Sequence, residues 1–122
     1  MGTIDDLIGY LDASRSPWHA ASPTTALLLV ACFQPLSLGD DWTDLPAAGF
    51  VASGASVVAF RTAEDAGAAP FRIVGAHTDS PCLRAKPRPD VGQLGWKQLA
   101  VEVYGGVLLN SWPDRDLCIA RR

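Results

Sequence analysis

The spacing of apolar and polar positions predicts two helices near the start of the chain. In residues 3–11 the apolar side chains recur every three or four positions, and a hydroxyl and two aspartates stand at the beginning, which is typical of an amphipathic helix. Residues 14–19 contain Pro17 and are expected to break it. A second helix is predicted from Ser22 and Pro23 to about Cys32. Because this helix is apolar nearly all round, we expect it to be buried on more than one side.

Short apolar runs between turn-forming residues then predict strands. Residues 50–52 and 56–61 are joined through a turn at Gly54, where glycine allows the positive φ that a hairpin needs. A further strand is predicted at residues 99–104, with Ala100, Glu102 and Tyr104 on one face. Gly105 and Gly106 end this strand.

Four other stretches read as connections or edges. Residues 35–49 and 64–70 are predicted loops, the first anchored by Trp42 and Leu45 and the second exposed to solvent. Residues 83–90 alternate and then carry two prolines, so they are predicted to form a hinge or an edge rather than a central strand. Residues 107–110 are a candidate for renewed strand pairing before the Trp112–Pro113 step.

Residues 71–81, FRIVGAHTDSP, are the stretch around which the rest of the chain is organised. A short apolar run leads into a glycine and stops at a proline, which predicts a central strand of an α/β sheet. Ligands of open α/β sheets bind beyond the carboxyl ends of the strands. His77 and Asp79 fall at that position.

His77 and Asp79 are the candidate chemical groups of the chain. Neutral imidazole is the commonest metal ligand, and a metal-bound histidine usually donates its other ring N–H to a carboxylate or a carbonyl. The residues therefore allow a metal site in which Asp79 supports this histidine or another one. The alternative is a strand end followed by a capping turn, and spacing alone favours that alternative.

Composition narrows the class of protein. The chain has 122 residues, 48% of them hydrophobic and 19% charged, as expected of one globular domain. A net charge of −3 gives no reason to expect nucleic acid or an anionic membrane as partner. No apolar run approaches a membrane span, and the acidic N-terminus is unlike a signal peptide. Three widely spaced cysteines indicate reduced thiols, so we expect a cytoplasmic protein.

Three further clusters have a functional and a structural interpretation. Arg84, Lys86 and Arg88 could bind phosphate or nucleic acid, but a solvated strand face fits the charge balance better. Residues 112–116 could hold a carboxylate–arginine network or be a polar turn with surface ion pairs. His19 could be a metal ligand, although a loop histidine satisfied by the backbone is the better interpretation.

Taken in order, several motifs resemble the aspartyl aminopeptidases, metallopeptidase family 18. The resemblance runs from about residue 5 to the last residue, and its most specific blocks are HTDSPCLR and VEVYGG. The motifs are SPWHA (16–20), GAHTDSPCLR (75–84), KP (86–87), VEVYGG (101–106), SW (111–112) and DRDL (114–117).

The resemblance implies a two-zinc exopeptidase that removes an N-terminal residue, often acidic, from peptides. In such enzymes the histidine that matches His77 ligates zinc, and the aspartate that matches Asp79 is the supporting catalytic carboxylate. A metal-bound water is made nucleophilic near neutral pH, with a glutamate as general base. Family members are homo-oligomers assembled from dimers.

The resemblance also implies the fold class, a zinc-peptidase-like mixed α/β sheet with flanking helices, interrupted by an inserted β-rich dimerisation domain. Residues 1–87 would be the N-terminal part of the peptidase domain. Residues 88–122 would be the first strands of the insert, so both would be incomplete here. The VEVYGG and DRDL blocks would then serve structure and assembly.

The chain departs from the family pattern in length and at three positions. Arg15 stands where proline is usual, Pro113 replaces an aromatic residue, and Arg121 replaces a glycine. The general base and the remaining zinc ligands would lie beyond Arg122, whereas a catalytic zinc needs three protein ligands. We therefore expect a truncated chain without activity by itself. The alternatives are an interaction module that pairs with a full-length paralogue, and a non-native metal site built from His77 and cysteines of several copies.

Overall fold

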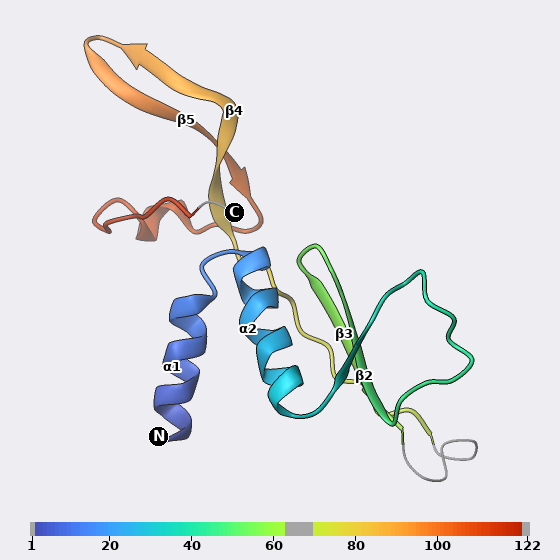
Figure 1. Cartoon of the computed structure of the whole chain (residues 1–122). Coiled ribbons are helices and arrows are strands. Elements are labelled where there is room, and N and C mark those ends of the chain that lie inside the picture. Colours follow the sequence, from blue (N-terminus) through green and yellow to red (C-terminus); the bar gives the residue numbers. More distant parts are fainter. Residues whose placement is uncertain (1, 63–69, 121–122) are drawn as a thin grey trace. The chain divides into compact units, whose positions relative to one another are not determined.

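The computed structural model describes residues 2–62 and 70–120, which belong to two compact units (Figure 1). The first unit runs to Thr78 and the second spans Asp79–Ile119. The described residues form a small mixed α/β arrangement of two α-helices, a three-stranded mixed sheet and a two-stranded antiparallel sheet. The elements are α1 (Thr3–Ala13), α2 (Pro17–Val30), β1 (Gln34–Leu36), β2 (Ala48–Ser53), β3 (Ser56–Arg61), β4 (Cys82–Gln93), β5 (Trp96–Tyr104) and η1 (Leu109–Ser111).

Helix α1 confirms the first predicted helix. Its first residue is Thr3, and the Gly2 amide just before it donates to Asp5 Oδ2 at 3.4 Å. The acidic first turn is favourable because the N-terminal end of a helix carries a partial positive charge. The helix continues two residues past the predicted end and finishes at Ala13, where the amide of Ser14 donates to the Leu11 carbonyl at 3.0 Å.

Helix α2 begins at Pro17, so the prediction of a start near Ser22 is wrong. The Ser16 hydroxyl accepts from the His19 amide at 3.4 Å, and Pro17 takes the first helical position, where it needs no N–H partner. Pro23 consequently lies inside the helix and removes one main-chain hydrogen bond. Residues 16–23 contain two Ser–Pro pairs, and the first of them, not the second, caps the helix.

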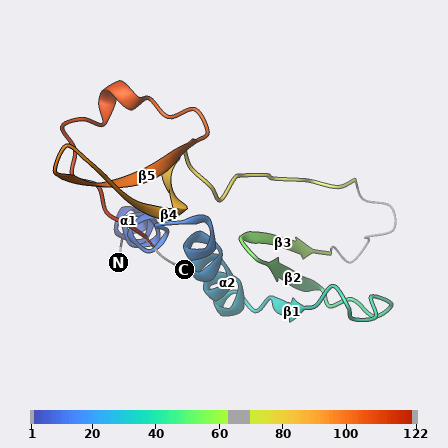
Figure 2. The ribbon, with the colours of Figure 1, turned by 90° about the horizontal axis from the view of Figure 1, so that it is seen from above.

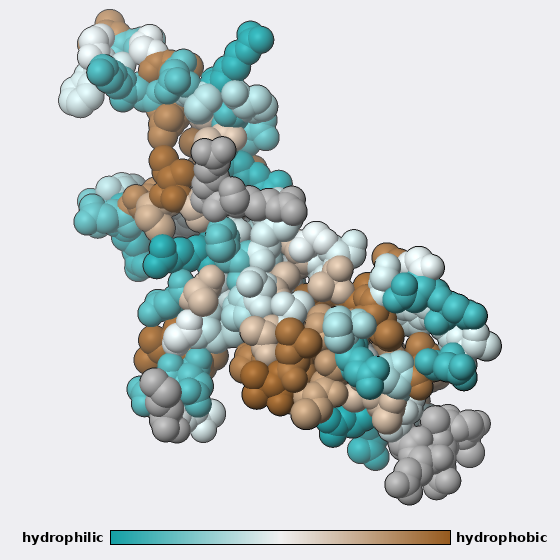
Figure 3. Space-filling view, in the orientation of Figure 1, coloured by the Kyte–Doolittle hydropathy of each residue, from teal (hydrophilic) through white to brown (hydrophobic). Residues whose placement is uncertain are grey.

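The first unit buries few side chains. The Tyr10 hydroxyl meets Thr24 Oγ1 at 2.9 Å, which joins α1 to α2, and α2 contacts all three strands of the sheet. Among the described residues the buried hydrophobic side chains are Ala20, Ala21 and Phe50. Leu27 and Leu29 in the second half of α2 are exposed, so the expectation that this helix is buried on several sides is wrong for this structure. Hydrophobic side chains accordingly lie on the visible surface in Figure 3.

The three-stranded sheet has the order β1-β2-β3 and contains the predicted hairpin. Strands β2 and β3 pair antiparallel, and Gly54 in their turn has a φ of 61°, as the sequence requires. Strand β1 pairs parallel with β2 and was not predicted, because it lies at the edge of the supposed loop 35–49. In the remainder of that loop, the Trp42 indole N–H donates to the Ser37 carbonyl at 3.1 Å.

Residues 71–76 do not form the predicted central strand. The described residues 70–81 belong to no helix or strand, and Phe71, Ile73 and Val74 are 94%, 88% and 98% exposed. A buried strand needs backbone partners on both edges and apolar cover on both faces. The sheet β1-β2-β3 provides neither here, because the segment pairs with none of its strands. The predicted loop 64–70 lies outside the described residues except for Pro70.

The second unit is built on a long β-hairpin. Strands β4 and β5 pair antiparallel through a two-residue turn, Leu94–Gly95, in which both φ angles are positive. The pairing is interrupted between Ala85 and Asp90, where Pro87 and Pro89 cannot donate to a ladder. The prediction of an edge or hinge at this place is confirmed, and β5 confirms the strand predicted at residues 99–104.

Strand pairing does not resume after β5. Gly105 has a φ of 73° and turns the chain at the end of the strand, and the next element is the single 3₁₀ turn η1. The expectation of a strand at residues 107–110 is therefore wrong. Pro113 lies in a turn, and Arg121 lies outside the described residues. The proposed domain division between residues 87 and 88 falls within β4 and stays a prediction.

The cap of α2 gives a test of this part of the fold. Replacing Ser16 with alanine removes the hydroxyl that accepts from the His19 amide, so we expect a loss of about 1 kcal/mol in the free energy of unfolding. Urea unfolding, monitored by circular dichroism, measures this loss of stability. Ser22→Ala is the matched control, since this serine lies inside the helix, and its loss should be near zero. Equal losses in both variants would contradict the assignment of the cap.

Candidate active site

His77 lies at the end of the irregular segment that follows Pro70, and its side chain is exposed. The next residue is fixed to the first unit, because the Thr78 hydroxyl donates to the Ala55 carbonyl in the β2–β3 turn at 2.9 Å. The turn predicted from Gly54 thus anchors the chain one residue after the candidate ligand. The backbone around His77 is positioned by side-chain bonding rather than by a strand ladder.

Asp79 opens the second unit and is partly buried. Its Oδ2 atom accepts a hydrogen bond of 2.7 Å from the hydroxyl of Tyr104, the last residue of β5. Hydrogen bonds from a hydroxyl to a carboxylate are short and about twice as strong as neutral ones. The carboxylate of Asp79 is therefore held by a residue 25 positions further along the chain.

Arg84 completes the surroundings of the Tyr104 ring. Its guanidinium carbon lies 3.5 Å from the ring centroid, which is within the range of a cation–π interaction. The pairing explains this contact: Cys82 is opposite Tyr104, and Arg84, two residues on, projects from the same face of β4. Arg84 is exposed, as are Lys86 and Arg88, in agreement with the predicted solvated face.

The backbone of Gly105 lies close to Pro81, two residues after Asp79. An added Cβ atom on Gly105 would lie 3.4 Å from Pro81 Cα and 3.6 Å from the Pro81 ring, so the end of β5 packs against the residue two positions after Asp79. The positive φ of Gly105 also favours glycine there. The Tyr104 side chain thus contacts Asp79, and the Gly105 backbone lies beside Pro81.

The contacts with Asp79 and Arg84 change the pKa of Tyr104. The hydrogen bond to Asp79 and the negative charge of that carboxylate raise the pKa of Tyr104 above its ordinary value of 10.0, and the nearby Arg84 opposes the effect. A phenolate facing a carboxylate is disfavoured, so Tyr104 stays a hydrogen-bond donor throughout the neutral pH range.

The donor chemistry of His77 fits zinc, but the described residues do not complete a site. An imidazole and carboxylates are ordinary zinc ligands, and a catalytic zinc takes three from the protein. Within residues 2–62 and 70–120 no group of three His, Cys, Asp or Glu side chains is placed to hold a metal ion. The three cysteines are free thiols, and only Cys82 is partly buried.

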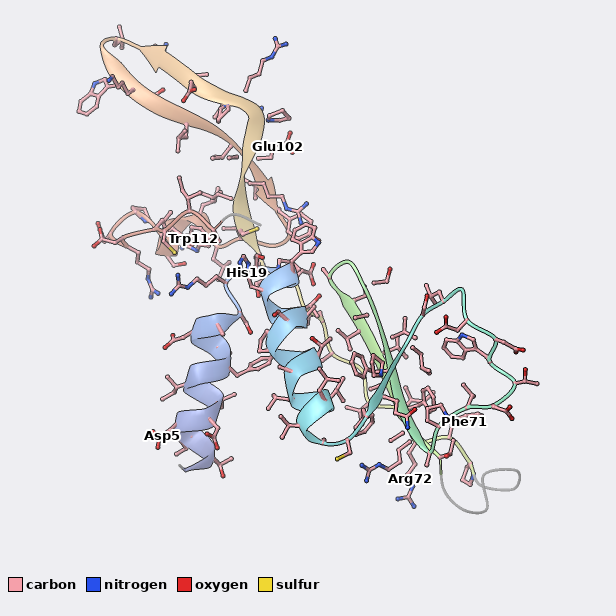
Figure 4. All side chains as sticks on the ribbon, viewed as in Figure 1. Asp5, His19, Phe71, Arg72, Glu102 and Trp112 are labelled. Atoms are coloured by element: carbon pink, nitrogen blue, oxygen red, sulfur yellow. The ribbon has the colours of Figure 1, made fainter. Side chains whose placement is uncertain are left out.

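His19, the second histidine, belongs to the cap of α2. Its Nδ1 atom lies 2.6 Å from the Ser16 hydroxyl, and in Figure 4 it stands at the N-terminal end of the helix. The predicted loop histidine is therefore a helical one that pairs with a side chain.

A shallow groove of about 440 Å³ lies beside α2 and is lined by Trp18, His19, Ala21, Ser22, Thr25, Ala52 and Gly54. Figure 2 shows α2 and the β2–β3 hairpin from above.

Sequence patterns alone missed Tyr104, which contacts Asp79, and Arg84, which covers the Tyr104 ring. The alternation of residues 99–104 placed Tyr104 on a face with Glu102, and the family resemblance gave the VEVYGG block a structural role only. The residue of β4 that faces Tyr104 is set by the turn at Leu94–Gly95 together with the register shift between Ala85 and Asp90. A positive φ at a leucine is unusual, and the length of the irregular stretch is not visible in the alternation of the sequence, so the register could not be predicted. No helix in the described part of the chain is long and apolar enough to span a membrane.

The HTDSP motif resembles that of metallopeptidases, and a family model supports this class. The model described as "Aminopeptidase I zinc metalloprotease (M18)" matches residues 10–122. The chain belongs to the M18 family.

Relatives and a solved structure agree with this assignment. The chain is 51% identical to a "Probable M18 family aminopeptidase 2" of Streptomyces coelicolor over 99% of its own length, and 45% identical to the protein of the same name from Mycobacterium leprae over 96%. It spans 28% of the length of each relative. A chain in the cryo-EM structure of the Ape4 and Nbr1 complex matches with a TM-score of 0.79 and 31% identity, over 91% of this chain and 22% of that chain.

The raised pKa of Tyr104 predicts how the second unit responds to alkali. Because the phenolate is disfavoured in the folded hairpin, this contribution to stability is complete below pH 10 and is lost as the pH rises through the raised pKa. Tyrosine absorbance titration measures the pKa, and Tyr10→Phe leaves Tyr104 as the only phenol of the chain. Asp79→Asn should return the pKa toward 10. A Tyr104 pKa that does not respond to Asp79→Asn would contradict the geometry.

Proposed function

We propose that this chain supplies the first part of the active site of a zinc-dependent aminopeptidase that removes N-terminal residues, acidic ones in particular, from peptides. The match of residues 10–122 to the M18 zinc metalloprotease model is the observation that carries the proposal. The HTDSPCLR block lies inside that match and contains both candidate residues. The preference for an acidic residue rests on the resemblance to aspartyl aminopeptidases.

In this proposal His77 holds zinc and Asp79 is the supporting carboxylate. The exposure of the His77 imidazole suits a ligand that meets further ligands from elsewhere in the polypeptide. Asp79 is oriented by Tyr104, as a carboxylate with a fixed catalytic task requires. Bound zinc would supply Lewis acidity and a water with a lowered pKa.

We further propose that residues 1–87 are the N-terminal part of a zinc-peptidase α/β domain and that residues 88–122 begin an inserted β-rich dimerisation domain. The three-stranded sheet with α2 against it, and the long β4–β5 hairpin, support this division into two kinds of structure. Assembly into homo-oligomers would follow through the insert.

The isolated 122-residue chain is proposed to be inactive. His77 is the only residue that the resemblance identifies as a zinc ligand. The described residues contain no group of three His, Cys, Asp or Glu side chains that could hold a metal ion. A single imidazole cannot fix a catalytic zinc with an open coordination position.

A second candidate function is an interaction module that pairs with a full-length member of the same family. The exposure of Phe71, Ile73 and Val74 favours it, because apolar side chains in this number are usually covered by a partner. Co-purification of the chain with such a paralogue supports this function, whereas a stable monomer that captures none opposes it.

A chimera tests the proposed chemistry. Residues 1–122 are fused to the part of the Streptomyces coelicolor relative that the chain does not match, which restores the length of a family member. We expect the purified chimera to contain zinc and to release acidic N-terminal residues from peptides. His77→Ala should lower zinc content and reduce kcat/KM by ~100-fold or more, since even residues that only support a metal ligand cost 10–100-fold.

The matched control is His19→Ala, which removes the other histidine of the chain and should leave zinc content unchanged. The isolated chain should release no residue under the same conditions. Zinc content that does not depend on His77 in an active chimera would contradict the assignment. Release by the isolated chain, lost on His77→Ala, would contradict the proposed need for further ligands.

A further inference from the structure

We propose that Tyr104 and Arg84 are positioning residues that hold the carboxylate of Asp79 in one orientation. The functional meaning of this orientation rests on the proposed function, in which Asp79 is the supporting carboxylate. The contacts themselves do not depend on that function. They give the β4–β5 hairpin a task in the active site in addition to structure and assembly.

The hydrogen bond defines the orientation of the carboxylate. Tyr104 Oη lies 2.7 Å from Asp79 Oδ2, and at neutral pH the phenol is the donor. One fixed oxygen restricts rotation about both the Cα–Cβ and the Cβ–Cγ bonds of Asp79. The side chain of Asp79 is thereby held to one rotamer, which a free turn aspartate would not be.

The donor is itself held in place. Tyr104 pairs with Cys82 in the β4–β5 ladder, so its Cα and Cβ atoms are fixed by backbone hydrogen bonds. The Arg84 guanidinium covers its ring at 3.5 Å and restricts rotation about the Cα–Cβ bond of Tyr104, which would carry the hydroxyl away. A rigid donor loses little conformational entropy when it binds the carboxylate.

The backbone beyond Asp79 is restrained from the same strand end. Gly105 lies beside Pro81, and a Cβ atom added to it would be in van der Waals contact with the proline. Residues 79–81 are thus contacted by Tyr104 through the carboxylate and by Gly105 through the backbone. Both contacts come from the VEVYGG block, in which Tyr104 lies 25 residues from Asp79 of the HTDSP motif.

The test measures the orientation of Asp79 directly in the metal-free, full 122-residue chain. Three-bond couplings of the Asp79 β protons report its χ1 rotamer by NMR. We expect one rotamer in the wild type and averaged couplings in Tyr104→Phe, which keeps the ring and loses the hydroxyl. Arg84→Met should give partial averaging, because it removes the cation over the ring and leaves the donor.

Tyr10→Phe is the matched control. The Tyr10 hydroxyl also makes one hydrogen bond between side chains, to Thr24 Oγ1, and its loss should leave the couplings of Asp79 unchanged. Cross-strand contacts between Arg84 and Glu102, which are partners in the ladder, report whether the hairpin stays folded. Asp79 couplings that are the same in Tyr104→Phe and the wild type, with the hairpin intact, would overturn the proposal.

If Tyr104→Phe unfolds the hairpin, the test is made on the wild-type chain. A nuclear Overhauser effect between the Tyr104 ring ε protons and the Asp79 β protons supports the proposal, and its absence overturns it. The outcome is separate from the proposed function, because no metal or substrate is present. A chimera without zinc would refute the role of His77 and leave the Tyr104–Asp79 result standing.

Discussion

The hydrogen bond from Tyr104 to Asp79 is the constraint on which the candidate site depends. It ties the end of β5 to the residue that opens the second unit and brings together two motifs that are distant in sequence. Its length of 2.7 Å and the charge of its acceptor make it one of the stronger contacts of the chain. The pairing of β4 with β5, the cation above the Tyr104 ring and the close approach of Gly105 to Pro81 all act to maintain it.

The first unit is constrained more weakly. Its sheet and helices are joined by local bonds such as the Ser16 cap and the Tyr10–Thr24 contact, while few side chains are removed from water. Burial of apolar surface is the main favourable term in folding. Residues 71–76 have the composition of a buried strand and yet are exposed, so this segment buries no apolar surface within the described residues.

Local signals in the sequence were sufficient for the elements that local chemistry determines. Helix α1 and the β2–β3 hairpin were predicted, because an acidic first turn and the glycine at position 54 act within a few residues. The start of α2 was not, since two Ser–Pro pairs compete and the cap at Ser16 is visible only in three dimensions. The family motif pointed to His77 and Asp79. The contacts of Tyr104 with Asp79 and with Arg84 could not be predicted, because they depend on a hairpin register that shifts between Ala85 and Asp90.

The most direct test of the central claim is the coupling energy between Tyr104 and Asp79. The free energy of unfolding is measured for the wild type, Tyr104→Phe, Asp79→Asn and the double variant. Residues in contact have non-additive effects on stability, and we expect the double variant to lose less than the sum of the two single variants. Strictly additive effects would mean that the two side chains act independently, and would contradict the account of how this chain holds its candidate catalytic carboxylate.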